Sequence, residues 1–165
     1  MVDSAADNAG PSGAATLERA KSLANEAMFT VALQRRRIRS DEPEDNVFVM
    51  RWWADLQFFI VALRRLRRAA ELACKVSSAE PGLVLAVKAF DGVLPCLSVM
   101  RNVGEHIEDY AVDEGRDSRI DRRRIQVGTF DGVKYEWLGK SLNIDVAHDA
   151  AAELFAAISA APAVP

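Results

Sequence analysis

The segment VFVMRWWADLQFFIVALRRLRRAAELACKV, Val47 to Val76, is the longest part of the chain in which apolar residues recur with helical spacing. Spacings of three and four residues are typical of an amphipathic α-helix. At 1.5 Å per residue such a helix is about 45 Å long. Its apolar stripe is wide enough to contact more than one partner helix and contains Val49, Trp52, Trp53, Leu56, Phe59, Ile60, Leu63, Leu66, Ala70 and Ala73. The segment therefore predicts a central scaffold helix.

Two further helices have clear boundary signals. Residues 14–39 keep helical apolar spacing and predict a first helix. The loop at 40–46 ends at Asn46, a residue type that caps helix N-termini, so the scaffold helix is expected to begin directly after it. Asn143 has the same role for a last helix at 144–160. The residues of that helix expected to face inward are Val146, Ala150, Leu154, Phe155 and Ile158.

Two prolines divide the middle of the chain. Pro81 is well placed to open a third helix at 82–90, because proline fits the first helical turn. Pro95 would break a helix interior but is tolerated near a helix start. We therefore expect a fourth helix over residues 91–113 that begins at Asp91 or the next residue, with Asp91 as its cap.

Residues 125–137 alternate between apolar and polar side chains around an Asp-Gly pair, which predicts a β-hairpin. A two-residue loop would place Ile125 opposite Leu138. A three-residue loop would place Ile125 opposite Trp137 and would give Gly132 a positive φ angle. We prefer the three-residue loop.

These elements fit one domain. The chain has 165 residues, half of them apolar, which is enough to build a single core. We expect an all-α fold over residues 14–160, a four- to five-helix up-and-down bundle with the small β-hairpin near 125–137. Residues 1–13 and 161–165 are small, polar or proline-bearing, and we expect them to be disordered.

Composition limits the partners and the compartment. The formal net charge is −3, so a polyanion such as RNA would need a local basic patch. The most apolar stretch, 56–63, is far shorter than the roughly 20 residues of a membrane span. The N-terminus has early acidic residues and no apolar core, unlike a secretory signal. We expect a cytoplasmic protein with no membrane partner, in which Cys74 and Cys96 are buried reduced thiols rather than a disulfide.

The segment RNVGEHIEDY, Arg101 to Tyr110, holds the candidate functional residues. On a helical wheel Arg101 and His106 flank a polar face roughly 140° apart, so one helix presents them poorly to a single phosphate. Two such helices packed around a two-fold axis would bring Arg101 of one copy toward His106 of the other. Asn102, His106 and Tyr110 follow at a spacing of four, which lets Asn102 orient the imidazole and Tyr110 line the same groove.

An arginine, a polar residue, three further residues and a histidine make up a motif that resembles the Arg-x4-6-His motif of the HEPN superfamily. The order of a long helix, a shorter helix and a motif-bearing helix is also similar to that family. The resemblance implies a homodimer in which two motifs meet in a cleft. It also implies a metal-independent endoribonuclease of toxin or defence systems that needs no cofactor. An antitoxin or a nucleotidyltransferase would then be a further partner.

The motif residues suit RNA cleavage. RNA carries its own nucleophile, the 2′-hydroxyl, so cleavage needs a base, an acid and positive charge on the phosphorane, and no metal. His106 could act as base or acid, Arg101 could hold the phosphate bidentately, and Asn102 would be the orienting residue. These three are the candidate catalytic residues, and Tyr110 and Glu105 are candidate binding residues. The sequence contains no HExxH motif, glycine-rich phosphate loop or Cys/His ligand spacing.

A second interpretation is a non-catalytic module of the same fold that binds RNA or a protein. Acidic residues crowd the motif helix and repel a polyanion. In this interpretation Arg101 pairs with Glu105 at a spacing of four, while Asn102 and His106 make only local hydrogen bonds.

Other charged and aromatic residues each allow two interpretations. Arginine-rich runs at 35–39, 64–68 and 122–124 either bind phosphate or balance nearby acids. His148 is either a surface residue or part of a His/Asp metal site. The three tryptophans are either core or interface residues or base-stacking platforms. For each of them we favour the structural alternative.

Overall fold

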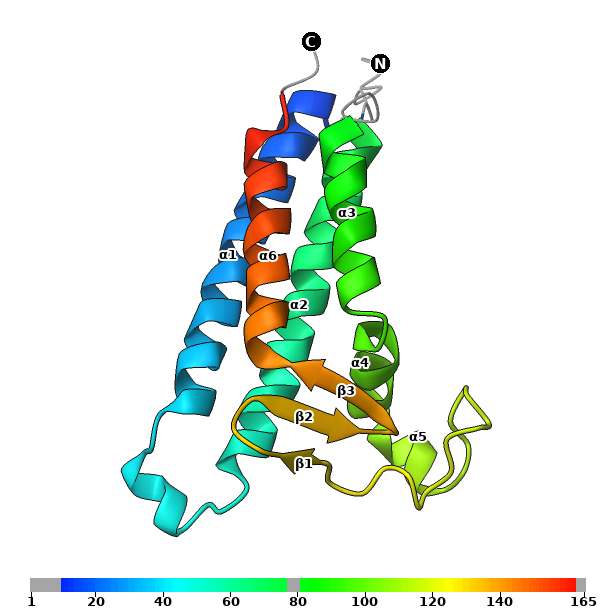
Figure 1. Ribbon diagram of the computed structural model, residues 1–165. Helices are drawn as coiled ribbons and strands as arrows, with labels where there is room; N and C mark the ends of the chain where they lie inside the picture. The colour runs from blue at the N-terminus through cyan, green and yellow to red at the C-terminus, as the bar shows by residue number, and fades with distance from the viewer. Residues whose placement is uncertain (1–9, 77–80, 163–165) are drawn as a thin grey trace, which may run out of the picture.

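The protein is a bundle of long α-helices closed at one end by a small β-sheet (Figure 1). The computed structural model describes residues 10–76 and 81–162. The long helices are α1 (Gly13–Arg39), α2 (Arg51–Val76), α3 (Pro81–Val93) and α6 (Ile144–Ala160). The mainly helical architecture is therefore confirmed. The predicted disorder of residues 1–13 and 161–165 lies outside the described residues at 1–9 and 163–165. It was wrong at Ser12 and Gly13, which cap and begin α1, and at Ala161, which is only 3% exposed.

Helix α2 is the scaffold of the bundle. It packs against α1, α3, α6 and the short helix α4 (Leu97–Glu105). Its inward stripe is fully buried at Leu56, Phe59, Ile60, Leu63 and Leu66. Burying each of these side chains contributes about 1.5–3 kcal/mol, so this stripe is a main source of the stability of the fold. The predicted role of the segment as a central helix is confirmed.

The predicted start of the scaffold helix was wrong. Asn46 does not cap α2 but ends a short 3₁₀-helix, η1 (Pro43–Asn46), and α2 begins only at Arg51. The intervening residues lie outside any helix with exposed side chains, including Val49, which was expected to be buried. These exposed residues are Val47, Phe48, Val49 and Met50.

The Arg51 side chain explains why the helix starts late. Its guanidinium donates to the backbone oxygens of Arg37 at 2.8 Å and Ser40 at 2.7 Å. It also binds the carboxylates of Asp45 and Asp55. These contacts fold residues 40–50 back against the end of α1, and Asp55 is only 4% exposed. A continuous helix through residue 47 would be incompatible with them.

The expected fourth helix, 91–113, was also wrong, because it is divided into three pieces. Helix α3 continues to Val93, and Asp91 lies within it, where it pairs with Arg67 at 2.7 Å instead of capping a helix. Helix α4 starts only after Pro95. It ends at Glu105, since His106 leaves the helical conformation with φ −126° and ψ 36°. Helix α5 (Ile107–Ala111) follows in a new direction.

The sheet has three antiparallel strands instead of the two expected: β1 (Thr129–Phe130), β2 (Lys134–Trp137) and β3 (Lys140–Asn143). Neither predicted register was correct, because Phe130 pairs with Tyr135 and residues 131–133 connect the two strands. The Asp131 carboxylate accepts hydrogen bonds from the Val133 and Lys134 amides and so fixes this connection. Gly132 has the expected positive φ of 93°.

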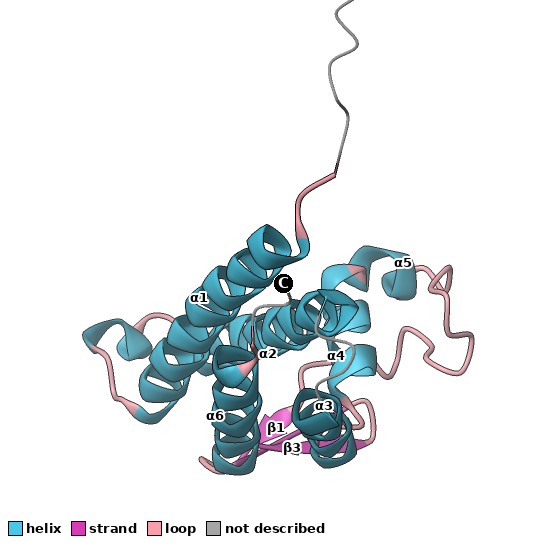
Figure 2. Cartoon of the chain, turned by 90° about the horizontal axis from the view of Figure 1, so that it is seen from above, coloured by secondary structure: helices cyan, strands magenta, loops and turns pink. Residues whose placement is uncertain are grey.

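The third strand follows a tight turn that the sequence did not predict. Trp137 pairs with Lys140 across Leu138 and Gly139. Both central residues have positive φ angles, 55° and 68°, as in a type I′ turn. Leucine is unusual in that conformation, so the Leu-Gly pair gave no turn signal. Seen along the bundle, the sheet lies across its end below α6 and α3 (Figure 2).

The tryptophans belong to the packed interior around the sheet, as expected. Trp137 is 3% exposed and meets Trp53 edge to face at 6.3 Å. Trp52 stacks on Phe130 with 5.9 Å between the ring centres. The Trp137 indole donates to the Gln126 carbonyl at 2.8 Å, which fastens the preceding loop to the sheet.

The last helix agrees with the sequence in all but one position. The Asn143 side chain caps α6 by accepting hydrogen bonds from the Asp145 and Val146 amides. Ala150, Leu154 and Ile158 are buried and Phe155 is partly buried, whereas Val146 is half exposed, contrary to the expectation.

Cys74 and Cys96 are both free thiols, as expected, and Cys96 is buried, whereas Cys74 is only partly buried. Burial raises the pKa of each thiol, so neither is activated as a nucleophile. No single helix among the described residues is long and apolar enough to cross a membrane. The pair α3 and α4 passes the same test together, but the two helices meet at a bend of 70°.

Candidate anion-binding pocket

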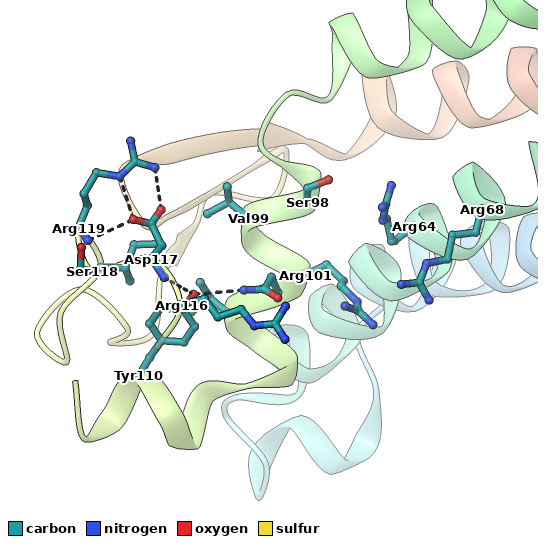
Figure 3. Close-up of a pocket in the computed structure, with 13 residues that line it drawn as sticks. Arg64, Arg68, Ser98, Val99, Arg101, Tyr110, Arg116, Asp117, Ser118 and Arg119 are labelled. Atoms are coloured by element: carbon teal, nitrogen blue, oxygen red, sulfur yellow. Dashed lines mark hydrogen bonds and ion pairs between the residues drawn. The ribbon is translucent and has the colours of Figure 1, made fainter. Parts of the chain in front are cut away.

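A pocket of about 570 Å³ lies between α2, α4 and the loop that follows α5. Five of its lining residues are arginines, and we call it the arginine pocket. They are Arg64 and Arg68 of α2, Arg101 of α4, and Arg116 and Arg119 of the loop. Figure 3 shows Arg101 and Arg116 between the α2 arginines on one side and the Asp117–Arg119 pair on the other.

Local sequence explains how the arginines converge. Arg64 and Arg68 are one helical turn apart, so they point from the same face of α2. Helix α4 packs against α2, which brings Arg101 and Asn102 to that face. The loop residues are held over the pocket by Tyr110, which is only 1% exposed.

Tyr110 joins the motif helix to the loop. Its phenolic oxygen accepts hydrogen bonds from the Asn102 side-chain amide at 3.2 Å and from the Asp117 backbone amide at 3.3 Å. Asn102 therefore orients Tyr110, whereas the sequence suggested that it orients His106. Asn102 and Tyr110 both line the pocket.

Positive charge exceeds negative charge in the pocket. Asp117 is its single acidic lining residue, and it binds Arg119 through two hydrogen bonds of 2.8 Å. This bidentate pair lowers the pKa of Asp117 to about 2, so the carboxylate stays ionised and neutralises Arg119. Within the described part of the chain, Arg64, Arg68 and Arg116 form no ion pair.

Arg101 forms an ion pair within its own helix, and this pair competes with any ligand for the guanidinium. Its guanidinium forms an ion pair with Glu105, one turn along α4, as the second interpretation of the sequence had it. The Arg101 side chain is 22% exposed and that of Glu105 is 34% exposed, so solvent and ligands can reach the pair. Glu105 does not line the pocket itself.

His106 lies apart from the arginine pocket. It occupies the junction of α4 and α5, its side chain is 47% exposed, and its Nδ1 atom is 3.8 Å from an Asp109 carboxylate oxygen. The structure therefore brings Arg101, Asn102 and Tyr110 together but leaves His106 outside. One chain alone does not form a site that contains both Arg101 and His106.

The first two arginine-rich runs have different environments. Arg35 and Arg39 bind Asp145, and Arg37 binds Asp55, so the first run balances acids as expected. The arginines of the run at 64–68 have two environments. Arg67 pairs with Asp91, whereas Arg64 and Arg68 line the arginine pocket.

Sequence reasoning did not single out Arg116 and Arg119, which lie in a loop without helical or strand periodicity. Arg64 and Arg68 belong to the arginine-rich run at 64–68, for which phosphate binding was the alternative that we did not favour. Their spacing of four on one helix was a further signal that the two side chains lie on the same face.

Within residues 10–76 and 81–162, no group of three His, Cys, Asp or Glu side chains could hold a metal ion. His148 pairs with its neighbour Asp149 at 3.2 Å, and its side chain is 22% exposed. Comparisons of the chain with protein-family models, with curated proteins and with solved structures find no match.

Proposed function

We propose that the chain is a HEPN-like RNA-binding protein that holds backbone phosphate in the arginine pocket. The convergence of Arg64, Arg68, Arg101 and Arg116 on one solvent-accessible cavity carries the proposal. Guanidinium groups bind phosphate oxygens bidentately and remain charged at all physiological pH values. Because the whole chain carries a net charge of −3, the attraction must be local, and a concave wall of arginines concentrates it.

The test compares RNA binding by the wild type with that by the double variant Arg64→Gln/Arg68→Gln. Fluorescence anisotropy of a labelled single-stranded RNA, measured over a range of salt concentrations, should show at least about tenfold weaker binding by the variant at low salt. The slope of log affinity against log salt should fall by about 0.7 for each phosphate that the variant no longer neutralises.

Arg19→Gln/Lys75→Gln is the matched control, because it removes two exposed charges from α1 and α2 that lie outside the arginine pocket and outside the interface proposed below. Its salt slope should stay close to that of the wild type. Absence of RNA binding by the wild type at low salt, or equal losses in the two double variants, would overturn the proposal.

RNA cleavage is the second candidate function. The half-exposed imidazole of His106 favours it, since a histidine outside the arginine pocket stays accessible to a substrate held between two chains. His106 would take the proton of the 2′-hydroxyl or protonate the leaving 5′-oxygen, and Arg101 of a second copy would hold the phosphate.

Cleavage of a structured RNA in the presence of a chelator tests this candidate. The wild type should yield products that end in a 2′,3′-cyclic phosphate, and His106→Ala should yield none, whereas His148→Ala should behave like the wild type. Equal cleavage by the wild type and His106→Ala would exclude His106 as a catalytic residue.

Two copies of the chain are needed for such a composite site, and we infer that they pack through the start of α2. The Ala54 amide donates to the Met50 oxygen at 3.4 Å, so Met50, Ala54 and Phe58 share one helix face at a spacing of four. Phe58 is 61% exposed, and Phe48 beside this face is 64% exposed. An exposed apolar patch of this kind is typical of an interaction site.

Charge complementarity favours a second copy as the occupant of this patch. Arg51 and Arg65 are equidistant from Phe58 along α2. If two α2 helices pack antiparallel around a two-fold axis at Phe58, the loop at Asp41–Asp45, which is bound to Arg51, faces Arg65 of the other copy. Asp41 is exposed and Asp45 partly exposed, so this loop presents negative charge to that arginine.

A further inference from the structure

Two further hollows lie next to the arginine pocket on the side of the sheet. A second hollow of about 220 Å³ adjoins it and shares four of its lining residues, including Asp117 and Arg119. A third hollow of about 470 Å³ lies against the sheet and shares Arg124, Leu138 and Lys140 with the second. The three hollows are therefore neighbours that share walls in a series from α2 to the β2–β3 turn, and we call this series the basic groove.

Cations line the whole length of the basic groove. Arg124 and Lys140 continue the series that begins with the five arginines of the pocket. Asp117 and Glu136 are the acidic residues that line the groove in the described part of the chain, and Asp117 is already bound to Arg119. The positive charge of Lys140 also helps to lower the pKa of Asp117, so it acts within the same groove.

Apolar side chains form the floor between the cations. Val99 and Ile120 lie in both the arginine pocket and the second hollow, and Leu138 lies in the second and third. Unpaired bases can contact such a floor while the phosphates contact the cations at its edges. A duplex presents mainly phosphates and ribose to a protein and would leave these apolar residues without a partner.

We propose that the basic groove binds a single-stranded RNA segment several nucleotides long, with one phosphate in the arginine pocket and its continuation beside Arg124 and Lys140. This proposal rests on the proposed function, since it names the form of RNA that the arginine pocket takes. The proposal adds a second region of RNA contact, beside the sheet, to the arginine pocket at α4.

Oligonucleotide length provides the test. Affinities of the full chain for single-stranded di-, tetra- and octanucleotides are measured by anisotropy at low salt. The wild type should bind the octanucleotide at least about tenfold more tightly than the dinucleotide, because only the longer strand reaches both ends of the groove. A double-stranded RNA of the same length should bind more weakly than the single strand.

Variants at the far end separate the two regions. Arg124→Gln/Lys140→Gln should weaken octanucleotide binding about tenfold and lower its salt slope by about 1.4, yet leave dinucleotide binding in the arginine pocket unchanged. Arg122→Gln/Arg123→Gln is the control, because it removes two charges from the same loop outside the three hollows.

The outcomes distinguish the two proposals. If no RNA binds at low salt, the proposed function fails and the groove fails with it. If all lengths bind equally, if Arg124→Gln/Lys140→Gln matches its control, or if duplex binds as tightly as single strand, the groove proposal is overturned while the arginine pocket stands.

Discussion

The Glu105 carboxylate competes with any phosphate for the Arg101 guanidinium. The two side chains form an ion pair within α4, and both are accessible to solvent. A ligand phosphate must therefore displace Glu105 before it can bind Arg101 bidentately. An accessible pair of this type contributes roughly 0.2–1 kcal/mol, a small barrier to exchange.

Glu105→Gln should accordingly increase affinity for single-stranded RNA by a few-fold, because Arg101 becomes free and one negative charge is removed. Glu108→Gln removes the same charge one turn further along, outside the described ion pairs, and serves as the control. Anisotropy titrations at low salt measure both effects. An equal gain in the two variants would mean that general charge, and not release of Arg101, is responsible.

At the scale of single elements, the loop after α5 depends on close packing against Tyr110. A Cβ atom added at Gly115 would overlap the Tyr110 ring. That ring cannot move aside, because it is buried and its hydroxyl binds Asn102 and Asp117.

Gly115→Ala should therefore destabilise the protein by about 1–3 kcal/mol and weaken RNA binding, since Arg116 follows directly in the displaced loop. Gly92→Ala in α3 is the control, because its added Cβ meets nothing within 4 Å. It should be neutral or stabilising by up to about 1 kcal/mol. Urea unfolding and RNA titration of both variants give the comparison. A Gly115→Ala protein as stable as the wild type would contradict the packing described.

The loop before α2 should respond to acid through Asp45. The hydrogen bond from Arg51 lowers the pKa of Asp45 from 3.8 to about 2. Ionised Asp45 therefore contributes stability that is complete above its unfolded pKa and is lost as the pH falls through about 2.

Asp45→Asn should lower stability at neutral pH, and its deficit relative to the wild type should shrink between about pH 5 and 2. Asp41→Asn changes a carboxylate of the same loop that does not contact Arg51, and it should lack this convergence. Thermal unfolding at several pH values is the measurement. A deficit of Asp45→Asn that stays constant across the window would show that the ion pair does not anchor the loop.

The sequence predicted elements whose signals are local. Asn143 caps α6 as expected, because its side chain needs only the next two amides. The break at His106 could not be predicted, since helical apolar spacing continues beyond it and the break accompanies the hydrogen bond between Tyr110 and Asp117, seven residues later. The apolar run Val47–Met50 also continues the helical spacing, so the sequence did not show that α2 begins only at Arg51. The contacts that set this start join Arg51 to the backbone oxygens of Arg37 and Ser40, which are remote in the sequence.

The candidate site was predictable only in part. Arg101, Asn102 and Tyr110 are close together in one segment of the chain, so the motif was enough to group them, and they do meet in the pocket. Arg64 and Arg116 come from segments that meet α4 only after folding. Their contribution follows from the packing of α2 against α4 and from the course of the loop, neither of which composition reveals.

At the scale of the whole molecule, the proposed self-association through α2 can be tested separately from the proposed RNA binding. Phe48→Ser/Phe58→Ser should convert a dimer to a monomer in sedimentation velocity, because it removes the largest exposed apolar side chains of the proposed interface. Leu85→Ser alters a side chain that is 64% exposed on α3, a different face, and should leave the mass unchanged.

If the wild type sediments as a monomer at all concentrations, the interface is absent and the composite site with it. If the double variant stays dimeric, the two copies meet through another face. In a dimeric wild type, Arg65→Glu should weaken association and Arg36→Glu should not, since only Arg65 would face the acidic loop of the second copy.

Helix α1 begins and α6 ends at the same end of the bundle, opposite the sheet (Figure 1). A biotin or a flexible tether attached near either position would therefore sit far from the β2–β3 turn. The protein could be immobilised on a sensor surface with its sheet end turned toward the solution. Binding kinetics of individual RNA strands, and pulling experiments on the loop over Tyr110, could then be recorded on an anchored molecule without the support obstructing the ligand.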